Sequence, residues 1–178
     1  MNKNKLCNIA KAMVAKGKGI LAADESTPTI GKRLQSIGVK STCETRNEYR
    51  DMLFTANNME KYISGVIMFH ETLKQSTTCR DKIPFVKLLN DKGIIPGIKV
   101  DTGAKELAGF PGEKITEGLD GLRERLQEYY EIGARFAKWR AVITIGEDKP
   151  SDLCISANAH ALGRYASLCQ ELNIVPIV

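Results

Sequence analysis

The sequence predicts an α/β fold built around a parallel sheet. Short apolar runs recur along the 178-residue chain, most of them continuously apolar, and amphipathic helical patterns lie between them. Continuous apolar runs are typical of parallel strands that are covered on both faces. The centres of the runs lie roughly 30 to 46 residues apart, which is the rhythm of repeated β-α units with right-handed crossovers.

Five of these runs are expected to form strands. In chain order they are Gly19–Ala23, Gly65–Phe69, Ile94–Val100, Ala134–Arg140 and Ile174–Val178. Pro96 and Pro176 fall inside two of them. Because proline has no N–H to donate to a strand ladder, we expect pairing to be interrupted at both positions.

Three helical patterns lie between the expected strands. Their apolar stripes are Tyr49, Met52, Leu53 and Ala56; then Leu122, Leu126 and Tyr129; then Leu162, Tyr165, Cys169 and Leu172. Asp120 is placed to cap the second helix, and Gly133 is placed to end it.

Five strands admit two architectures. An open doubly wound sheet would be complete in itself, whereas a (β/α)8 barrel takes about 250 residues and would stop after its fifth strand. Periodicity alone does not decide between them.

The composition is that of an ordinary globular chain, with 43% hydrophobic and 26% charged residues. No run approaches the roughly 18 apolar residues that cross a bilayer, and the lysine-rich start does not resemble a secretory signal. Residues 1–40 carry a net charge of +6, but no aromatic residue lies among their lysines. We therefore expect neither a membrane nor a nucleic-acid partner, and interpret these lysines as a solvated face or as attraction for small anions.

The cysteines and histidines indicate a cytoplasmic protein without a metal site. The five cysteines are odd in number, widely spaced and without a C-x-x-C pair, which is typical of reduced thiols. The two histidines, His70 and His160, are ninety residues apart and lack a second ligand at helical spacing.

Charged residues end three of the expected strands, at the edge where β-α folds place their active groups. Lys138 and Arg140 share one face of their strand while Trp139 points away, and two adjacent cations are costly unless an anion offsets them. Lys99 and Asp101 share a face in the same way and could pair. These charges either extend into solvent at the sheet rim or form a site for a phosphorylated substrate.

Four segments carry a family resemblance over nearly the whole chain. They are Lys18–Thr27 (KGILAADEST), Pro96–Asp101 (PGIKVD), Gly118–Leu122 (GLDGL) and Gly133–Arg140 (GARFAKWR). Together they closely resemble class I fructose-bisphosphate aldolase. The resemblance implies a (β/α)8 TIM barrel, of which residues 1–178 form the N-terminal part of a single domain with the first five strands.

The resemblance also implies site residues. Asp24 matches the carboxylate that assists carbon–carbon cleavage, and Lys138 matches a lysine that contributes electrostatically. The substrate-binding positions that match are Ser26, Thr29, Arg33, Arg46, Lys99 and Arg140. Thr29 stands where the family often has serine, and Thr102 departs from a frequent lysine.

The implied reaction cleaves fructose 1,6-bisphosphate into dihydroxyacetone phosphate and glyceraldehyde 3-phosphate through a lysine Schiff base, without metal or cofactor. In the family the acid–base glutamates follow V-P-I-V, and later strands bring the Schiff-base lysine; neither belongs to residues 1–178. We therefore expect the 178-residue chain alone to be inactive. The alternative is a non-catalytic chain that binds sugar phosphates or partners, and the family's usual assembly is a homotetramer.

Overall fold

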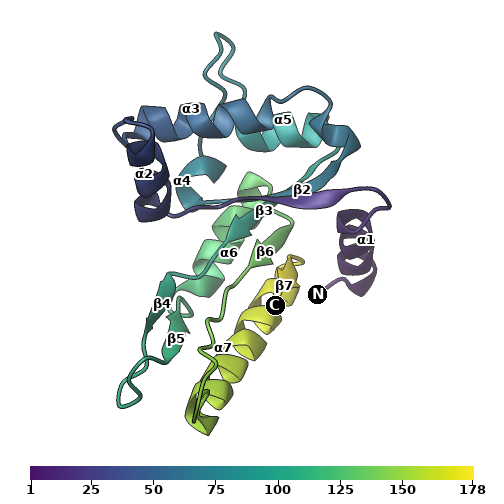
Figure 1. Ribbon diagram of the computed structural model, residues 1–178. Helices are drawn as coiled ribbons and strands as arrows, with labels where there is room; N and C mark the ends of the chain where they lie inside the picture. Colours follow the sequence, from purple (N-terminus) through teal and green to yellow (C-terminus); the bar gives the residue numbers. More distant parts are fainter.

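A computed structural model describes residues 1–178, and its main element is a five-stranded parallel sheet (Figure 1). The strands are β1 (Gly19–Ala23), β2 (Ile63–Met68), β3 (Ile95–Lys99), β6 (Phe136–Lys138) and β7 (Val175–Ile177). They lie side by side in chain order, and every neighbouring pair is parallel. The five predicted strands are thus confirmed, with ends that differ by no more than two residues.

Helices and one antiparallel hairpin connect the strands. The helices are α1 (Lys3–Met13), α2 (Thr27–Ser36), α3 (Cys43–Phe54), the 3-10 turn η1 (Met59–Lys61), α4 (His70–Leu73), α5 (Phe85–Asp91), α6 (Leu122–Ile132) and α7 (Asp152–Glu171); the hairpin pairs β4 (Gly103–Glu106) with β5 (Lys114–Glu117). None of the helices combines the length and apolar character that crossing a membrane requires.

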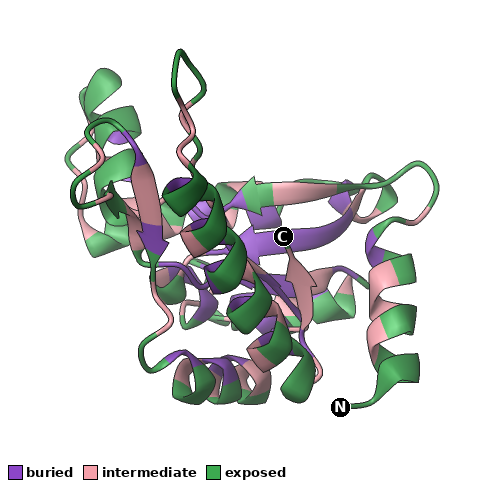
Figure 2. Cartoon of the chain, turned by 90° about the horizontal axis from the view of Figure 1, so that it is seen from below, coloured by how far each residue is buried: buried purple, intermediate pink, exposed green.

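The strand order distinguishes the two architectures. A doubly wound sheet reverses its order at a switch point, whereas this sheet runs from β1 to β7 without reversal. The main apolar core joins the sheet to α3, α5, α6 and α7, and buried residues follow the strands and the sheet-facing sides of the helices (Figure 2). The fold is therefore α/β, with the five-stranded parallel sheet of a partial TIM barrel.

A smaller apolar cluster covers the opposite face of the sheet, which is the inner face of the barrel. It consists of Met13, Ile67 and Phe136, with α1 packed beside it. The Phe136 ring lies across Gly97 so closely that a Cβ at Gly97 would come within 2.2 Å of it. Glycine at this position lets one aromatic ring fill the interior.

Both prolines lie in strands whose register continues through them, so the expected interruption is wrong. Pro96 pairs with Val66, and its carbonyl accepts a hydrogen bond from the Arg135 N–H. Pro176 lies opposite Ala137 in β7, whose bonds to β6 involve the flanking residues. Since Pro176 faces the unpaired edge, its missing N–H breaks no ladder bond.

Two helical expectations also need correction. Met52, taken as part of the apolar stripe of α3, is 62% exposed, and the buried residues of this helix are Arg50 and Phe54. Asp120 does not cap α6, because Gly121 in the left-handed conformation (φ 63°) occupies the N-cap position. The stripe of α6 and its end at Gly133 are confirmed.

Several elements had no predicted counterpart. The segment from Gly103 to Gly112 contributes β4 and the tip of the hairpin. Helix α1 packs against β2 and β7, and the Asn2 N–H donates to Asn173 Oδ1 at 2.6 Å. This contact brings the N-terminus beside the turn that precedes β7 (Figure 1).

Candidate active site

A cavity of about 410 Å³ opens at the carboxyl edge of β1, β3 and β6. Thirteen residues line it: Ala22, Asp24, Glu25, Ser26, Thr29, Arg33, Lys99, Asp101, Gly103, Ala104, Lys138, Arg140 and Val142. Seven of the eight predicted site residues are among them. Alternating side chains explain this convergence, because residues two apart on a strand share a face and the strand ends meet at one edge.

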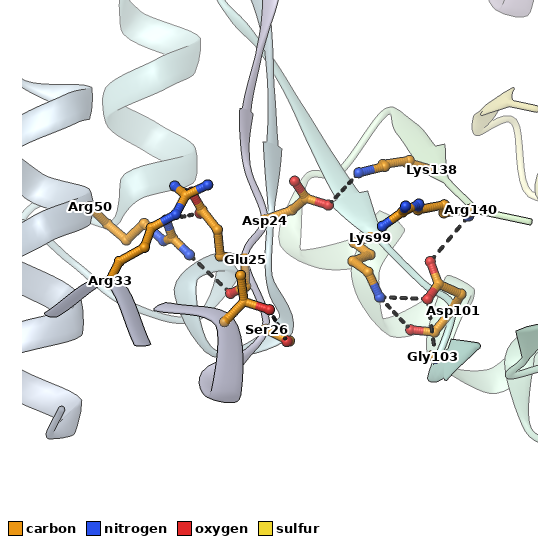
Figure 3. Close-up of polar contacts among 11 residues, drawn as sticks. Asp24, Glu25, Ser26, Arg33, Arg50, Lys99, Asp101, Gly103, Lys138 and Arg140 are labelled. Atoms are coloured by element: carbon orange, nitrogen blue, oxygen red, sulfur yellow. Dashed lines mark hydrogen bonds and ion pairs between the residues drawn. The ribbon is translucent and has the colours of Figure 1, made fainter. Parts of the chain in front are cut away.

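Asp24 and Lys138 meet inside this cavity (Figure 3). The Lys138 Nζ donates to Asp24 Oδ2 at 2.8 Å, joining the ends of two strands that are not neighbours in the sheet. Asp24 is only 7% exposed, so the carboxylate is held by this ammonium with little competition from water. A carboxylate beside an ammonium can bind a substrate hydroxyl and stabilise the charge that develops on it.

Lys99 and Asp101 form a second pair, as their shared face predicted. The Lys99 Nζ donates to Asp101 Oδ1 at 2.6 Å, and the same oxygen accepts from the Gly103 N–H at 3.2 Å. The other carboxylate oxygen accepts from the Arg140 backbone N–H at 3.3 Å. Asp101 therefore joins the end of β3 to the segment after β6. Its two carboxylate oxygens position the Lys99 ammonium and the Arg140 backbone.

Glu25 holds two arginines, an arrangement that the sequence did not predict. Its carboxylate accepts from Arg33 through one oxygen and from Arg50 through the other (Figure 3). Arg50 also donates to the Glu25 backbone carbonyl at 3.1 Å and is 2% exposed. The only sequence signal was an arginine one turn before Phe54 on the buried face of α3.

Two hydroxyls stand at the start of α2. Ser26 is the N-cap residue, but its side chain makes no capping bond and instead contacts Thr29 Oγ1 at 3.1 Å. Both residues line the cavity. They are therefore placed to donate to a ligand near a helix N-terminus, where the helix dipole favours anions.

The balance of charge makes the cavity suited to anions. Four cationic side chains line it against three carboxylates, and each carboxylate is paired. Arg140 takes part in no ion pair, and its side chain extends in the same direction as that of Lys138 (Figure 3). Trp139 points away into the core, where it is 3% exposed, as expected. The Arg140 guanidinium is therefore available to bind a phosphate or a carboxylate.

Arg46 is the predicted site residue that the structure does not bring to this cavity. Its guanidinium forms two bonds to Glu71, at 2.8 Å and 2.6 Å. These bonds hold the pKa of the Glu71 carboxyl below its usual value and raise the pKa of Arg46. A substrate contact by Arg46 stays a prediction that would require Glu71 to release it.

The cavity has no ligand set for a metal ion. No group of three or more histidine, cysteine, aspartate or glutamate side chains is arranged to hold one. His160 lies on α7 and contributes to a different surface hollow. The chemistry available in the cavity is that of carboxylates, ammonium and guanidinium groups and hydroxyls.

Comparisons with known proteins point to one family. The family model described as fructose-bisphosphate aldolase class I matches residues 5–178. A probable class 1 fructose-bisphosphate aldolase of Xanthomonas campestris pv. campestris is 61% identical over 178 residues, which are 100% of this chain and 53% of that protein. A cytosolic fructose-bisphosphate aldolase of Arabidopsis thaliana is 55% identical over 175 residues, covering 98% of this chain and 48% of the relative.

A solved structure agrees with these matches. Fructose-bisphosphate aldolase of Plasmodium falciparum, solved in complex with TRAP and a small-molecule inhibitor, superposes with a TM-score of 0.94 at 51% identity. The match covers 98% of this chain and 50% of the other. The chain thus spans about half the length of the curated relatives that it matches.

Proposed function

The chain belongs to the class I fructose-bisphosphate aldolase family, and we propose that its residues form part of the active site of an enzyme that cleaves fructose 1,6-bisphosphate. The products would be dihydroxyacetone phosphate and glyceraldehyde 3-phosphate. We place residues 1–178 in the N-terminal part of a single barrel domain. The observation that carries the proposal is the cavity that unites Asp24, Lys99, Lys138 and Arg140.

The Asp24–Lys138 pair supplies groups for breaking the carbon–carbon bond. Cleavage of a β-hydroxy ketone requires a proton to leave the hydroxyl oxygen and electrons to move toward the carbonyl carbon. Asp24 holds that hydroxyl through its carboxylate, and the Lys138 ammonium, 2.8 Å from Asp24, stabilises the negative charge that develops on the oxygen. A lysine Schiff base would supply the electron sink.

The remaining cavity residues bind the phosphate groups and the sugar hydroxyls. Arg140 lies free of ion pairs and can take a phosphate through its planar guanidinium. Lys99 adds a second cation from the next strand, and Ser26 and Thr29 add hydroxyl donors. The Arg33 side chain is 58% exposed although it is paired with Glu25, so breaking that pair to contact a ligand costs little free energy.

We assign no lysine of residues 1–178 to the Schiff base. Lys138 matches a different lysine of the family, and the expected acid–base glutamates are also outside these residues. We propose that the 178-residue chain, expressed alone, cleaves no fructose 1,6-bisphosphate. A dihydroxyacetone phosphate adduct trapped on this chain by borohydride would refute that.

Substitution in the native protein tests the proposed roles. Asp24→Asn and Lys138→Met should each lower kcat by about 10²–10⁴-fold, since each removes a group that acts on the reacting atoms. Arg140→Ala should instead raise KM by about 10-fold or more. The matched control is Arg164→Ala, an exposed arginine of α7 outside every ion pair and outside this cavity, which should leave both constants unchanged. Unchanged kcat in Asp24→Asn would refute the assignment.

The structure also favours a second candidate, a non-catalytic sugar-phosphate-binding chain. The cations and hydroxyls of the cavity all belong to residues 1–178, so binding does not require the Schiff-base lysine. This candidate predicts that inorganic phosphate or fructose 1,6-bisphosphate stabilises the protein against heat without any turnover. Turnover by the native protein would exclude it.

Location and assembly are likewise proposals. We infer a cytoplasmic enzyme, supported by the reduced-thiol pattern of the cysteines and by the cytosolic Arabidopsis thaliana relative. We infer a homotetramer from the family resemblance alone. Sedimentation of the native protein tests the second point, and a mass other than four chains would refute it.

A further inference from the structure

A second cavity, of about 550 Å³, lies directly beside the first. It is a half-open hollow bordered by the start of α2, the turn between β2 and α4, the segment that follows β3, and α6. Its lining residues are Ser26, Pro28, Phe69, His70, Lys99, Val100, Asp101, Thr102, Gly103, Arg125 and Tyr129. Val100, Asp101 and Tyr129 are buried, whereas Pro28 and His70 are exposed. None of the predicted catalytic roles involves Phe69, His70, Arg125 or Tyr129.

The charge of this cavity is concentrated on Arg125. Lys99 and Asp101 neutralise one another, and Arg125 takes part in no ion pair of the structure. The Arg125 guanidinium donates only to two backbone carbonyls, those of Val100 at 2.9 Å and Gly118 at 2.5 Å. A guanidinium has five N–H donors, so several remain for a ligand. A half-buried cation without a carboxylate partner favours the binding of an anion.

Neutral polar groups stand beside this cation. The Tyr129 hydroxyl and His70 Nδ1 are 2.9 Å apart. Partial burial, together with Lys74 and Arg125, lowers the pKa of His70, and burial raises the pKa of Tyr129, so both groups are uncharged at neutral pH. The nearest carboxylate of α6, Glu128, is paired with Lys74. The net charge at this end of the cavity therefore stays positive.

The walls next to Arg125 are apolar. Phe69, Tyr129, Val100 and Pro28 all line the cavity. A phosphate dianion gains most where two cations and several hydroxyls converge, as in the first cavity. One free guanidinium within apolar walls is better matched to a singly charged acid group that carries an apolar body.

We propose that this second cavity binds a small organic monocarboxylate, with its acid group on Arg125 and its apolar part between Phe69 and Tyr129. This site adjoins the sugar-phosphate site and does not depend on the proposed reaction. Four residues belong to both cavities: Ser26, Lys99, Asp101 and Gly103. A carboxylate near Lys99 would compete with Asp101 and with phosphate for that ammonium, so each ligand should weaken the binding of the other.

Calorimetric titration of the native protein with benzoate tests the proposal. We expect binding in the millimolar range, weakened about 10-fold by Arg125→Gln, since one charge-assisted hydrogen bond contributes that much. Tyr129→Phe keeps the ring and removes the hydroxyl, and should weaken binding less. Saturating inorganic phosphate should weaken benzoate binding at least 2-fold, and benzoate should weaken phosphate binding by the same factor.

Two controls keep the result specific. Arg164→Gln removes an exposed arginine of α7 and should leave benzoate binding unchanged. Arg140→Ala removes the free cation of the first cavity and should change benzoate affinity by less than 2-fold. If Arg125→Gln does not fold, as judged by its melting curve, Arg125→Lys and Tyr129→Phe decide.

Three outcomes overturn the inference. The first is no benzoate binding by the native protein throughout the millimolar range. The second is unchanged affinity in every Arg125 and Tyr129 variant that folds. The third is affinity that Arg140→Ala abolishes and the Arg125 variants retain, which would place benzoate in the first cavity.

Discussion

The buried Arg50–Glu25 pair offers the sharpest test of how the site is held together. Arg50 lies on α3, is 2% exposed, and donates to both the carboxylate and the backbone carbonyl of Glu25. Glu25 follows Asp24 and precedes Ser26, so Arg50 anchors the segment that presents both. The perturbation is Arg50→Met, which keeps an unbranched apolar stem of similar length and removes the charge and the donors.

The expected loss follows from the surroundings of Glu25. Two charges about 4 Å apart attract by about 4 kcal/mol at an effective dielectric constant of 20, and removing one partner of a buried pair typically costs about 3–5 kcal/mol. Arg33 remains on the other carboxylate oxygen, but its side chain is 58% exposed and offsets at most about 1 kcal/mol. We therefore expect Arg50→Met to lower the free energy of unfolding by about 2–4 kcal/mol.

Urea unfolding of the native protein and its variants, run in parallel, measures this. Arg164→Met is the control, because Arg164 is exposed and outside every ion pair, and its change should stay within about 0.5 kcal/mol. The double variant Arg50→Met with Glu25→Gln should be less destabilised than the sum of the single variants, because neither then leaves an unpaired buried charge. A loss below about 1 kcal/mol for Arg50→Met, or simple additivity, would show that the Arg50–Glu25 pair does not anchor this segment.

Three further changes follow from other contacts. Gly97→Ala should destabilise the protein by about 1–3 kcal/mol in urea unfolding, because the added Cβ would lie 2.2 Å from a buried aromatic ring. Arg46 lowers the pKa of the Glu71 carboxyl, so this ion pair stabilises the fold above the ordinary pKa of 4.5. The contribution is lost as the pH falls through the lowered pKa. In Glu71→Gln the free energy of unfolding should therefore decrease less steeply at acid pH. The Thr77 hydroxyl and neighbouring backbone N–H groups lower the pKa of the exposed Cys79 thiol, so iodoacetamide should label it quickly and Thr77→Val should slow the labelling, as read by peptide mass spectrometry.

Each of these changes has a matched comparison in the chain. Gly19→Ala adds a Cβ in β1 with nothing within 4 Å, and a loss as large as that of Gly97→Ala would rule out the steric explanation. Glu48→Gln replaces an exposed carboxylate outside every ion pair, and should leave the acid limb as it is. Cys7 is exposed on α1, and faster labelling at Cys7 than at Cys79 would contradict the third prediction.

The inner strands β2 and β3 could be predicted because most of their residues are buried, whereas the edge strands β1 and β7 are only partly covered. Val66 and Met68 in β2, and Ile98 in β3, have no exposed surface, so continuous apolar runs mark them. The prolines misled because the sequence does not say on which side a missing N–H falls. Pro176 faces the open edge of β7, and only the neighbouring bonds of Val175 and Ile177 show that nothing is lost there.

The helices were harder, since partners distant in sequence decide which face of a helix is buried. On α3 the apolar Met52 lies in solvent while Arg50 is buried, because the Arg50 guanidinium donates to Glu25 and Thr72 on the buried side of the helix. An apolar count favours the wrong face whenever a charge is buried in a pair. Helix α6 starts after Gly121 in the left-handed conformation. An aspartate at position 120 does not indicate that the next residue, and not the aspartate itself, is the N-cap.

Strand alternation predicted which side chains share a face, and that is why Lys138 with Arg140, and Lys99 with Asp101, could be singled out. Strand alternation could not predict which carboxylate forms an ion pair with which cation on another strand. Asp24 and Lys138 are 114 residues apart, and their 2.8 Å contact exists only because β1 and β6 end at one edge with a gap that the intervening strands set. Pairing within a strand is thus a local property, whereas the pairing of Asp24 with Lys138 depends on how the sheet brings the ends of separate strands together. Arg140 takes part in no ion pair because each carboxylate that lines the cavity is already paired with another cation. An unpaired guanidinium beside neutralised ion pairs leaves a local positive charge that attracts an anionic ligand.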